Sequence, residues 1–179
     1  MTKRIIRISY FTMLTMIGSF LRVPIGTVYF TMQTLFVVLS GIVLGVRDGA
    51  ISQVAYVILG LVGLPVFSSG GGLSYVFQPS FGYLLAFPLG SALSALFFYK
   101  RKTLSTSVVF VCALIGLLPI YSIGISYQLM ILTNVLGLTS AGASVSLINI
   151  LLYFVIDCLL CYIVALLYPR ISTLLGKSD

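Results

Sequence analysis

The chain has 179 residues, of which 60% are apolar and 7% are charged. An ordinary soluble domain carries about 25% charged residues, so this composition excludes a water-soluble globular protein and predicts one transmembrane domain over residues 1–179. The net charge of +7 is not gathered on a basic face with interleaved aromatic residues, so we expect no nucleic-acid partner.

Six apolar segments are predicted to form membrane helices, which makes the fold class an all-α integral membrane protein. A helix needs about 20 residues to cross the hydrocarbon core. The second and third segments are shorter and are predicted to lean on their neighbours, with a tight turn at Gly45–Gly49 between them. The six segments are Ile5–Leu21, Thr31–Leu44, Ala50–Leu64, Phe81–Tyr99, Ser107–Ile131 and Val145–Tyr168.

The basic residues predict the orientation of these helices, because Lys and Arg favour the cytoplasmic side. With the N-terminus inside, nine of the ten basic residues face the cytoplasm and only Arg22 lies outside. We therefore expect both termini to be cytoplasmic and the protein to reside in the cell membrane. The first segment has no small-x-small cleavage site, so we interpret it as a retained helix and not as a signal peptide.

Two outer connections contain residues that break regular helices. Arg22–Phe30 contains Pro24, and Pro65–Ser80 contains the glycine-rich run Ser68–Gly72. Both lie on the same predicted face, so together they are expected to cover a pocket, with Leu73–Phe77 dipping back towards the membrane. A plain flexible hairpin is the alternative. No Lys-Ser/Thr pair follows the glycines, so this is not a phosphate-binding loop.

Asp157 is the one acidic residue inside a predicted span. Such a residue is costly in lipid and is a functional hypothesis by default. We expect it to accept hydrogen bonds from a ligand; the alternative is a protonated structural residue. Arg22, at the outer rim, is the candidate partner for a ligand carboxylate, with a solvated rim charge as its alternative.

Further candidate ligand-binding residues surround these two. Gln33 is a polar group at the start of a span, although such groups also hold helices together. Tyrosines gather towards the outer face, where an interfacial belt is the alternative; a flat ring with one polar tip would suit a small bicyclic ligand. The predicted site is completed by Tyr83, Tyr121, Gly70 and Gly71.

The sequence lacks residues for chemistry. It contains no His, no Glu and no Walker motif, so we expect no enzyme activity, no metal site, no cofactor and no ATP hydrolysis. The Cys158-x-x-Cys161 pair is interpreted as two small residues packed on a helix. This set of residues fits a binding subunit that relies on partner proteins for the energy of transport.

Several stretches resemble the BioY family, the biotin-specific substrate-binding (S) components of energy-coupling-factor (ECF) transporters. The similarity lies in Arg22–Ile25, Thr31–Phe36, Gly41–Gly45 and Gly60–Phe67, and continues to Pro79-x-x-Gly82-Tyr83. It implies six helices, capture of biotin or a close analogue from outside, and docking on a transmembrane coupling subunit that carries two cytoplasmic ATPases. Hydroxyl residues on the first helix, namely Ser9, Thr12, Thr15 and Ser19, are predicted to face that coupling subunit.

Two motifs depart from the family pattern. Gln78–Tyr83 stands where the family typically has Gly-Pro-Thr-Gly-Gly-Tyr, and the last-helix pattern Pro-Gly-Asp-x-x-Lys keeps Asp157 but has Leu160 in place of its Lys. A different small carboxylated vitamin or precursor, such as a lipoate-like acid, is therefore an alternative ligand. A membrane assembly subunit without a ligand is an alternative function.

Overall fold

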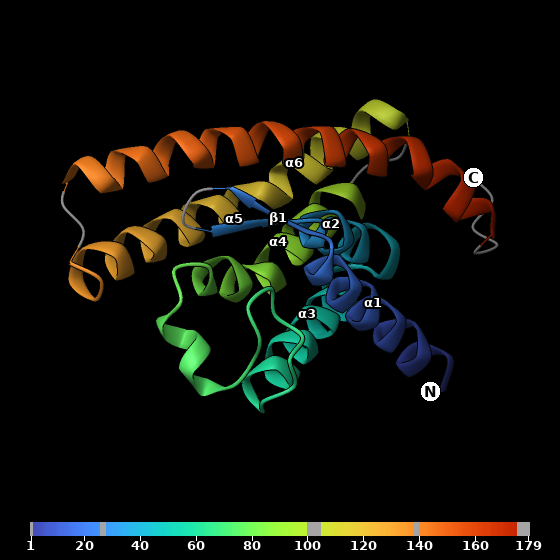
Figure 1. Ribbon diagram of the computed structural model, residues 1–179. Helices are drawn as coiled ribbons and strands as arrows, with labels where there is room; N and C mark the ends of the chain where they lie inside the picture. Colours follow the sequence, from blue (N-terminus) through green and yellow to red (C-terminus); the bar gives the residue numbers. More distant parts are fainter. Residues whose placement is uncertain (1, 26–27, 100–104, 138–139, 175–179) are drawn as a thin grey trace.

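A computed structural model of the chain describes residues 2–25, 28–99, 105–137 and 140–174. It contains six α-helices, as predicted, together with one short 3-10 helix, η1 (Leu73–Phe77), and a β-hairpin (Figure 1). The helices are α1 (Thr2–Phe20), α2 (Gln33–Leu44), α3 (Val46–Leu61), α4 (Phe81–Tyr99), α5 (Thr106–Asn134) and α6 (Ser140–Leu174).

The turn between α2 and α3 is tighter than predicted. Gly45 has a φ of 92°, a left-handed conformation that glycine adopts without steric cost. This single residue ends α2, and α3 begins at Val46. The prediction that Gly45–Gly49 forms a five-residue turn is therefore wrong, because one glycine suffices to reverse the chain.

The last two helices extend beyond their predicted ends. α5 has 29 residues and α6 has 35. At about 1.5 Å per residue they are about 44 Å and about 52 Å long, which exceeds the hydrocarbon thickness of about 30 Å. Their ends therefore reach past the hydrocarbon core.

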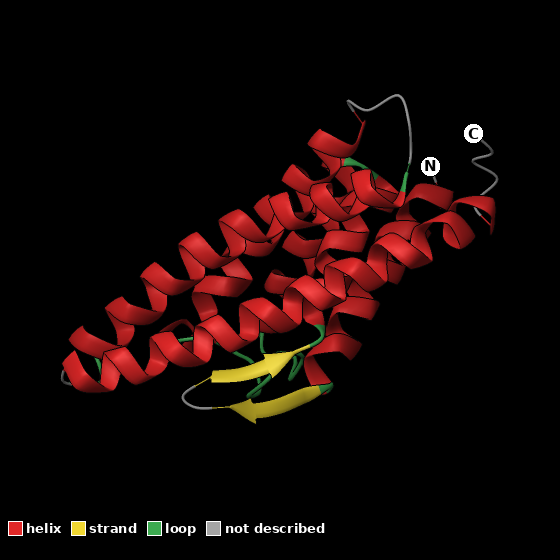
Figure 2. Cartoon of the chain, turned by 90° about the horizontal axis from the view of Figure 1, so that it is seen from above, coloured by secondary structure: helices red, strands yellow, loops and turns green. Residues whose placement is uncertain are grey.

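The connection after α1 forms a β-hairpin that the all-helical prediction missed. Strands β1 (Arg22–Ile25) and β2 (Val28–Thr31) are antiparallel, with Arg22 opposite Thr31 and Pro24 opposite Tyr29. The β-branched and aromatic residues of this stretch favour strands, and a proline is tolerated in a two-stranded ribbon because each strand is an edge. Figure 2 shows both strands lying beside the helical bundle.

The core of the bundle is built around α2. Val37, Val38 and Ile42 are fully buried, and α2 contacts α1, α3, α4, α5 and α6. A Cβ atom at Gly41 would collide with the carbonyl oxygen of Ser91 on α4, so these two helices meet backbone to backbone. Small residues permit this close packing inside membranes, where apolar burial alone does not drive helices together.

Large apolar side chains point outward from several helices. Leu118, Leu151 and Leu159 are each at least 60% exposed, as expected for surfaces that meet lipid. Three described segments are long and apolar enough to cross a membrane: α4, α5 and Asn149–Ile171 of α6. α2 is apolar but has only 12 residues, in agreement with its predicted dependence on neighbours.

The elements divide between two ends of the bundle. α1 begins, α4 ends and α6 ends at one end, whereas the hairpin and η1 lie towards the other (Figures 1 and 2). An even number of membrane crossings would produce this arrangement. Which end faces the cytoplasm stays a prediction from the basic residues.

Of the four hydroxyl residues of α1 that were predicted to face a coupling subunit, Ser9 is exposed and the other three face the inside of the protein's own bundle. Thr12, Thr15 and Ser19 are all buried. Their hydroxyls donate to the Ser52 carbonyl at 3.0 Å, to Gln53 Oε1 at 3.3 Å and to the Val66 carbonyl at 2.6 Å. The prediction that these three residues face a coupling subunit is therefore wrong, because they join α1 to α3 and to the segment that follows it.

Candidate ligand-binding site

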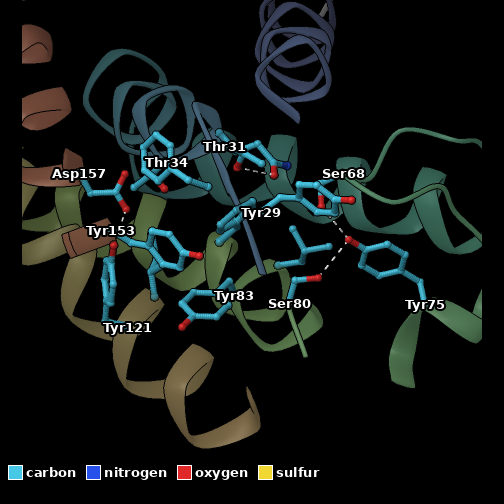
Figure 3. A pocket seen from close by; sticks show the side chains of 15 residues that line it. Tyr29, Thr31, Thr34, Ser68, Tyr75, Ser80, Tyr83, Tyr121, Tyr153 and Asp157 are labelled. Carbon is cyan, nitrogen blue, oxygen red and sulfur yellow. Dashed lines mark hydrogen bonds between the residues drawn. The ribbon is translucent and has the colours of Figure 1, made fainter. Parts of the chain in front are cut away.

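A cavity lies at the hairpin end of the bundle, between β2, η1 and helices α2, α4, α5 and α6 (Figure 3). The empty space within it, which includes space open to the outside, is about 540 Å³. The lining consists of Tyr29, Phe30, Thr31, Gln33, Thr34, Ser68, Tyr75, Ser80, Tyr83, Leu84, Phe87, Ile120, Tyr121, Tyr153 and Asp157.

Asp157 lies on one side of this cavity with one of its oxygens unused. The side chain is 4% exposed, and Oδ2 accepts a hydrogen bond of 2.7 Å from the Tyr121 hydroxyl. Oδ1 is buried and has no hydrogen-bond partner in the described part of the chain. Buried polar atoms are nearly always paired, so Oδ1 has the capacity to accept a further hydrogen bond; the Thr34 side chain is a neighbour that also interacts with this carboxyl group.

Aromatic rings form much of the wall between the polar groups. Tyr83 and Tyr121 meet edge to face, with centroids 6.1 Å apart, and Phe30 packs against Tyr153 at 6.0 Å. The Tyr83 hydroxyl donates to Gln128 Oε1 at 2.8 Å, so its polar tip is already engaged. These rings offer flat apolar surface to a ligand.

Gln33 occupies the junction between the hairpin and α2. Its Oε1 accepts from the Thr31 hydroxyl at 2.9 Å, and its Nε2 donates to the Tyr56 hydroxyl at 2.6 Å. Tyr56 in turn donates to the Val66 carbonyl at 3.1 Å. Gln33 therefore lines the cavity and also ties the hairpin to the segment after α3.

Both outer connections contribute to the lining, as predicted. β2 supplies Tyr29, Phe30 and Thr31, and the segment from Pro65 to Ser80 supplies Ser68, Tyr75 and Ser80. Within that segment Tyr75 is buried, and its ring centroid lies 6.4 Å from that of Phe81 on α4. The glycine-rich segment is therefore folded against the bundle and is not a plain hairpin.

Arg22 stands at the rim and not in the wall. Its guanidinium carbon lies 5.0 Å from the centroid of the Tyr29 ring, a cation–π distance, and Tyr29 lines the cavity. Among the described lining residues there is no Lys or Arg. The lining thus contains a carboxylate, neutral polar groups and apolar surface.

Gly70 and Gly71 shape the loop and do not line the cavity. Gly70 exchanges backbone hydrogen bonds of 2.9 and 3.2 Å with Phe67 and has a φ of 118°. A Cβ atom at Gly71 would collide with the Leu64 carbonyl. The cavity thus brings together four of the seven predicted site residues, namely Asp157, Gln33, Tyr83 and Tyr121.

Other lining residues were not among the predicted ones. Tyr153 precedes Asp157 by one helical turn, so it shares a face with it, and that spacing is a signal the sequence does contain. Thr34 sits beside Gln33 in α2. Ser68 and Ser80 belong to a long connection whose path no periodicity reveals.

Comparison with known proteins agrees with this fold. The model of the family described as the BioY family matches residues 1–177. The chain belongs to the BioY family. A relative from Lysinibacillus sphaericus, named a probable biotin transporter BioY, is 37% identical over 170 residues, covering 95% of this chain and 87% of the relative. The biotin transporter BioY of Thermotoga maritima is 36% identical over 124 residues, covering 69% and 72%.

A solved structure supports the same architecture for this BioY family member. The S component for biotin from an ECF-type ABC transporter superposes with a TM-score of 0.80 at 24% identity, covering 96% of this chain and 92% of the other. The likeness confirms the predicted six-helix S-component fold. Leu160, which stands where the family pattern noted above has Lys, is 5% exposed and does not line the cavity.

Proposed function

We propose that this chain is the biotin-binding S component of an ECF-type importer. The observation that carries the proposal is the unpaired, buried Oδ1 of Asp157 in an aromatic-walled cavity of a BioY family bundle. The printed functions of the relatives from Lysinibacillus sphaericus and Thermotoga maritima support it. The protein is a membrane binding subunit and not an enzyme.

The chemistry of biotin matches the groups in the cavity. Its ureido ring carries two N–H donors, and its fused bicycle is otherwise largely apolar. In our proposal Asp157 Oδ1 accepts a ureido N–H, while the Tyr121 hydroxyl, bound to Oδ2 at 2.7 Å, holds the carboxylate in place. Tyr83 flanks the bicycle with its ring, and Gln33 completes the polar lining.

Arg22 has a different part in this proposal. Its guanidinium lies over the Tyr29 ring at the rim of the cavity. There it attracts the carboxylate of the approaching ligand, because charges at the mouth of a cleft raise the local concentration of oppositely charged molecules. The side chain is exposed, so no desolvated ion pair is required.

Energy for accumulation comes from partner proteins. The sequence holds no nucleotide-binding motif, and a subunit that only binds its ligand cannot concentrate it. We propose that the chain docks on a transmembrane coupling subunit with two cytoplasmic ATPases. Large side chains on α1 that are more than half exposed, and so are available to this partner, are those of Ile5, Tyr10, Met13, Ile17 and Phe20.

Identification of the retained ligand tests the proposed function. The protein is purified in detergent from cells grown with both biotin and lipoate, and the small molecules it releases on denaturation are analysed by mass spectrometry. We expect biotin in amounts approaching one per protein, and titration calorimetry of the ligand-free protein should give tighter binding for biotin than for lipoate. Retention of lipoate, or of no vitamin at all, would refute the assignment.

A further inference from the structure

Three hydroxyl groups gather on the side of the cavity away from Asp157 (Figure 3). Ser68 Oγ and the Tyr75 hydroxyl are 3.0 Å apart, and the Tyr75 hydroxyl and Ser80 Oγ are 3.1 Å apart. We call Ser68, Tyr75 and Ser80 the hydroxyl cluster. All three residues line the cavity, and they come from the connection between α3 and α4.

The hydroxyl cluster holds one proton more than its internal hydrogen bonds use. Each hydroxyl has one donor and two acceptor lone pairs. Two hydrogen bonds join the three oxygens, so two protons are committed and one is left. Ser68 and Tyr75 are only 6% and 4% exposed, which leaves them little contact with bulk water. The cavity therefore offers a donor opposite the free acceptor of Asp157.

The charges around the cavity determine which ligand group can accept a hydrogen bond from this donor. No Lys or Arg lines the cavity in the described ranges, and Leu160 is buried outside it. A carboxylate taken out of water needs a counter-charge or several donors, and here it would share the cavity with Asp157. A neutral carbonyl needs only one donor, which is what the hydroxyl cluster supplies.

We propose that the hydroxyl cluster binds the carbonyl end of the ligand's side chain through neutral hydrogen bonds, so that the chain takes biotin amides and esters at least as well as biotin. This inference rests on the proposed function. The ligand then lies with its ureido ring at Asp157 and its side-chain carbonyl at Ser68, Tyr75 and Ser80. Arg22 at the rim attracts the carboxylate of biotin as it approaches, and it does not contact the carboxylate of the bound ligand.

A comparison of two ligands tests the inference on the unaltered protein. Titration calorimetry on the full chain in detergent measures the dissociation constants of biotin and of its primary amide. We expect the amide to bind within about threefold of biotin or more tightly. Biotin binding at least tenfold more tightly than the amide would overturn the inference while leaving the proposed function standing. Binding of neither ligand would overturn both.

Two variants locate the recognised end of the ligand. Tyr75→Phe keeps the ring and removes the central hydroxyl, and a net hydrogen bond of about 0.5–1.5 kcal/mol corresponds to a loss of about 2- to 12-fold for both ligands. Ser80→Lys adds a cation and should improve the ratio of biotin to amide affinity about tenfold or more. Ser69→Ala, at the neighbouring exposed serine, is the matched control and should change neither affinity.

These variants also have outcomes that count against the inference. A folded Tyr75→Phe protein, with an unfolding temperature near that of the parent, that binds both ligands unchanged would contradict it. A Ser80→Lys protein whose affinities for the amide and for biotin rise equally would also contradict it. The ligand comparison on the parent protein decides the matter even if Ser80→Lys does not fold.

Discussion

Asp157 gives the first prediction at the scale of single residues. Its Oδ2 accepts a hydrogen bond from Tyr121 and its Oδ1 is buried without a partner in the described residues, so Asp157→Ala removes the atom that we propose accepts a hydrogen bond from the ligand. A hydrogen bond to a charged group contributes about 1.5–3 kcal/mol, and titration calorimetry should therefore show biotin affinity falling about 10- to 100-fold.

Asp157→Asn separates a ligand role from a structural one. If the Asn carbonyl takes the hydrogen bond from Tyr121, the amide N–H₂ faces the ligand's own N–H donors, and most of the affinity is lost. Tyr121→Phe leaves the carboxylate in place, so it should lower the affinity for biotin less than either substitution at Asp157. Parent-like affinity in the Asn protein would remove Asp157 from the binding site.

Single residues also show what the sequence could reveal of the site. Asp157 and Gln33 were found because polar groups in apolar runs demand an explanation, and this signal needs no knowledge of the fold. Ser68 and Ser80 carry no such signal, since serines are ordinary in a polar connection. Their meeting with Tyr75 depends on the path of residues 65–80 over the bundle, which only the tertiary structure gives.

At the scale of elements, α1 is held to α3 by buried hydroxyls, and this predicts a stability effect. Thr15 is fully buried and donates to the Phe11 carbonyl at 2.9 Å and to Gln53 Oε1 at 3.3 Å. Thr15→Leu overfills the contact, which typically costs about 1–3 kcal/mol. Thermal unfolding in detergent should show a clear drop for this variant. Met13→Leu, at a half-exposed position of the same helix, should change little, and equal effects would contradict the packing.

The hairpin predicts an effect on the rate of association. Arg22 lies over Tyr29 at the rim, so Arg22→Gln should slow the binding of anionic biotin several-fold at low salt. The difference should fade as ionic strength rises, because salt screens exposed charges, and the neutral amide should bind at an unchanged rate. Stopped-flow fluorescence measures these rates. Arg47→Gln, which removes the same charge from the exposed start of α3, is the matched control. If Arg22→Gln instead changed only the dissociation rate of biotin, the result would argue for direct contact between Arg22 and the bound carboxylate.

The elements differ in how far the sequence could predict them. Apolar runs located the six helices, and Phe81–Tyr99 matches its predicted span residue for residue. The hairpin was missed because Arg22–Thr31 is short and interrupted by Pro24 and Gly26, so it lacks a sustained alternation of apolar and polar residues. The turn at Gly45 was placed correctly but made too long, since nothing in the sequence states that one left-handed glycine is enough.

At the scale of the whole molecule, the distribution of basic residues predicts which end of the bundle faces outward. Ser69 is exposed in the connection between α3 and η1, and Arg101 belongs to the basic connection after α4. In a background in which Cys112, Cys158 and Cys161 are replaced, Ser69→Cys should react with a membrane-impermeant thiol reagent in intact cells. Arg101→Cys should react only after the cells are opened. The reverse pattern would invert the topology and place the cavity towards the cytoplasm.

The whole chain also predicts a separation between binding and accumulation. Asp157 is the one carboxylate in the membrane spans, and a proton-driven carrier usually needs a relay of such groups. Cells that make this chain without any ECF coupling subunit or ATPase should bind biotin at their surface without raising its internal concentration above that of the medium. Adding an ECF module should restore accumulation, measured as uptake of radiolabelled biotin. An ATPase made inactive in its nucleotide site should abolish it while surface binding persists, and Asp157→Ala should lose both signals. Active accumulation by the chain alone would mean that the energy enters through this protein itself, and that its role as a dependent binding subunit is wrong.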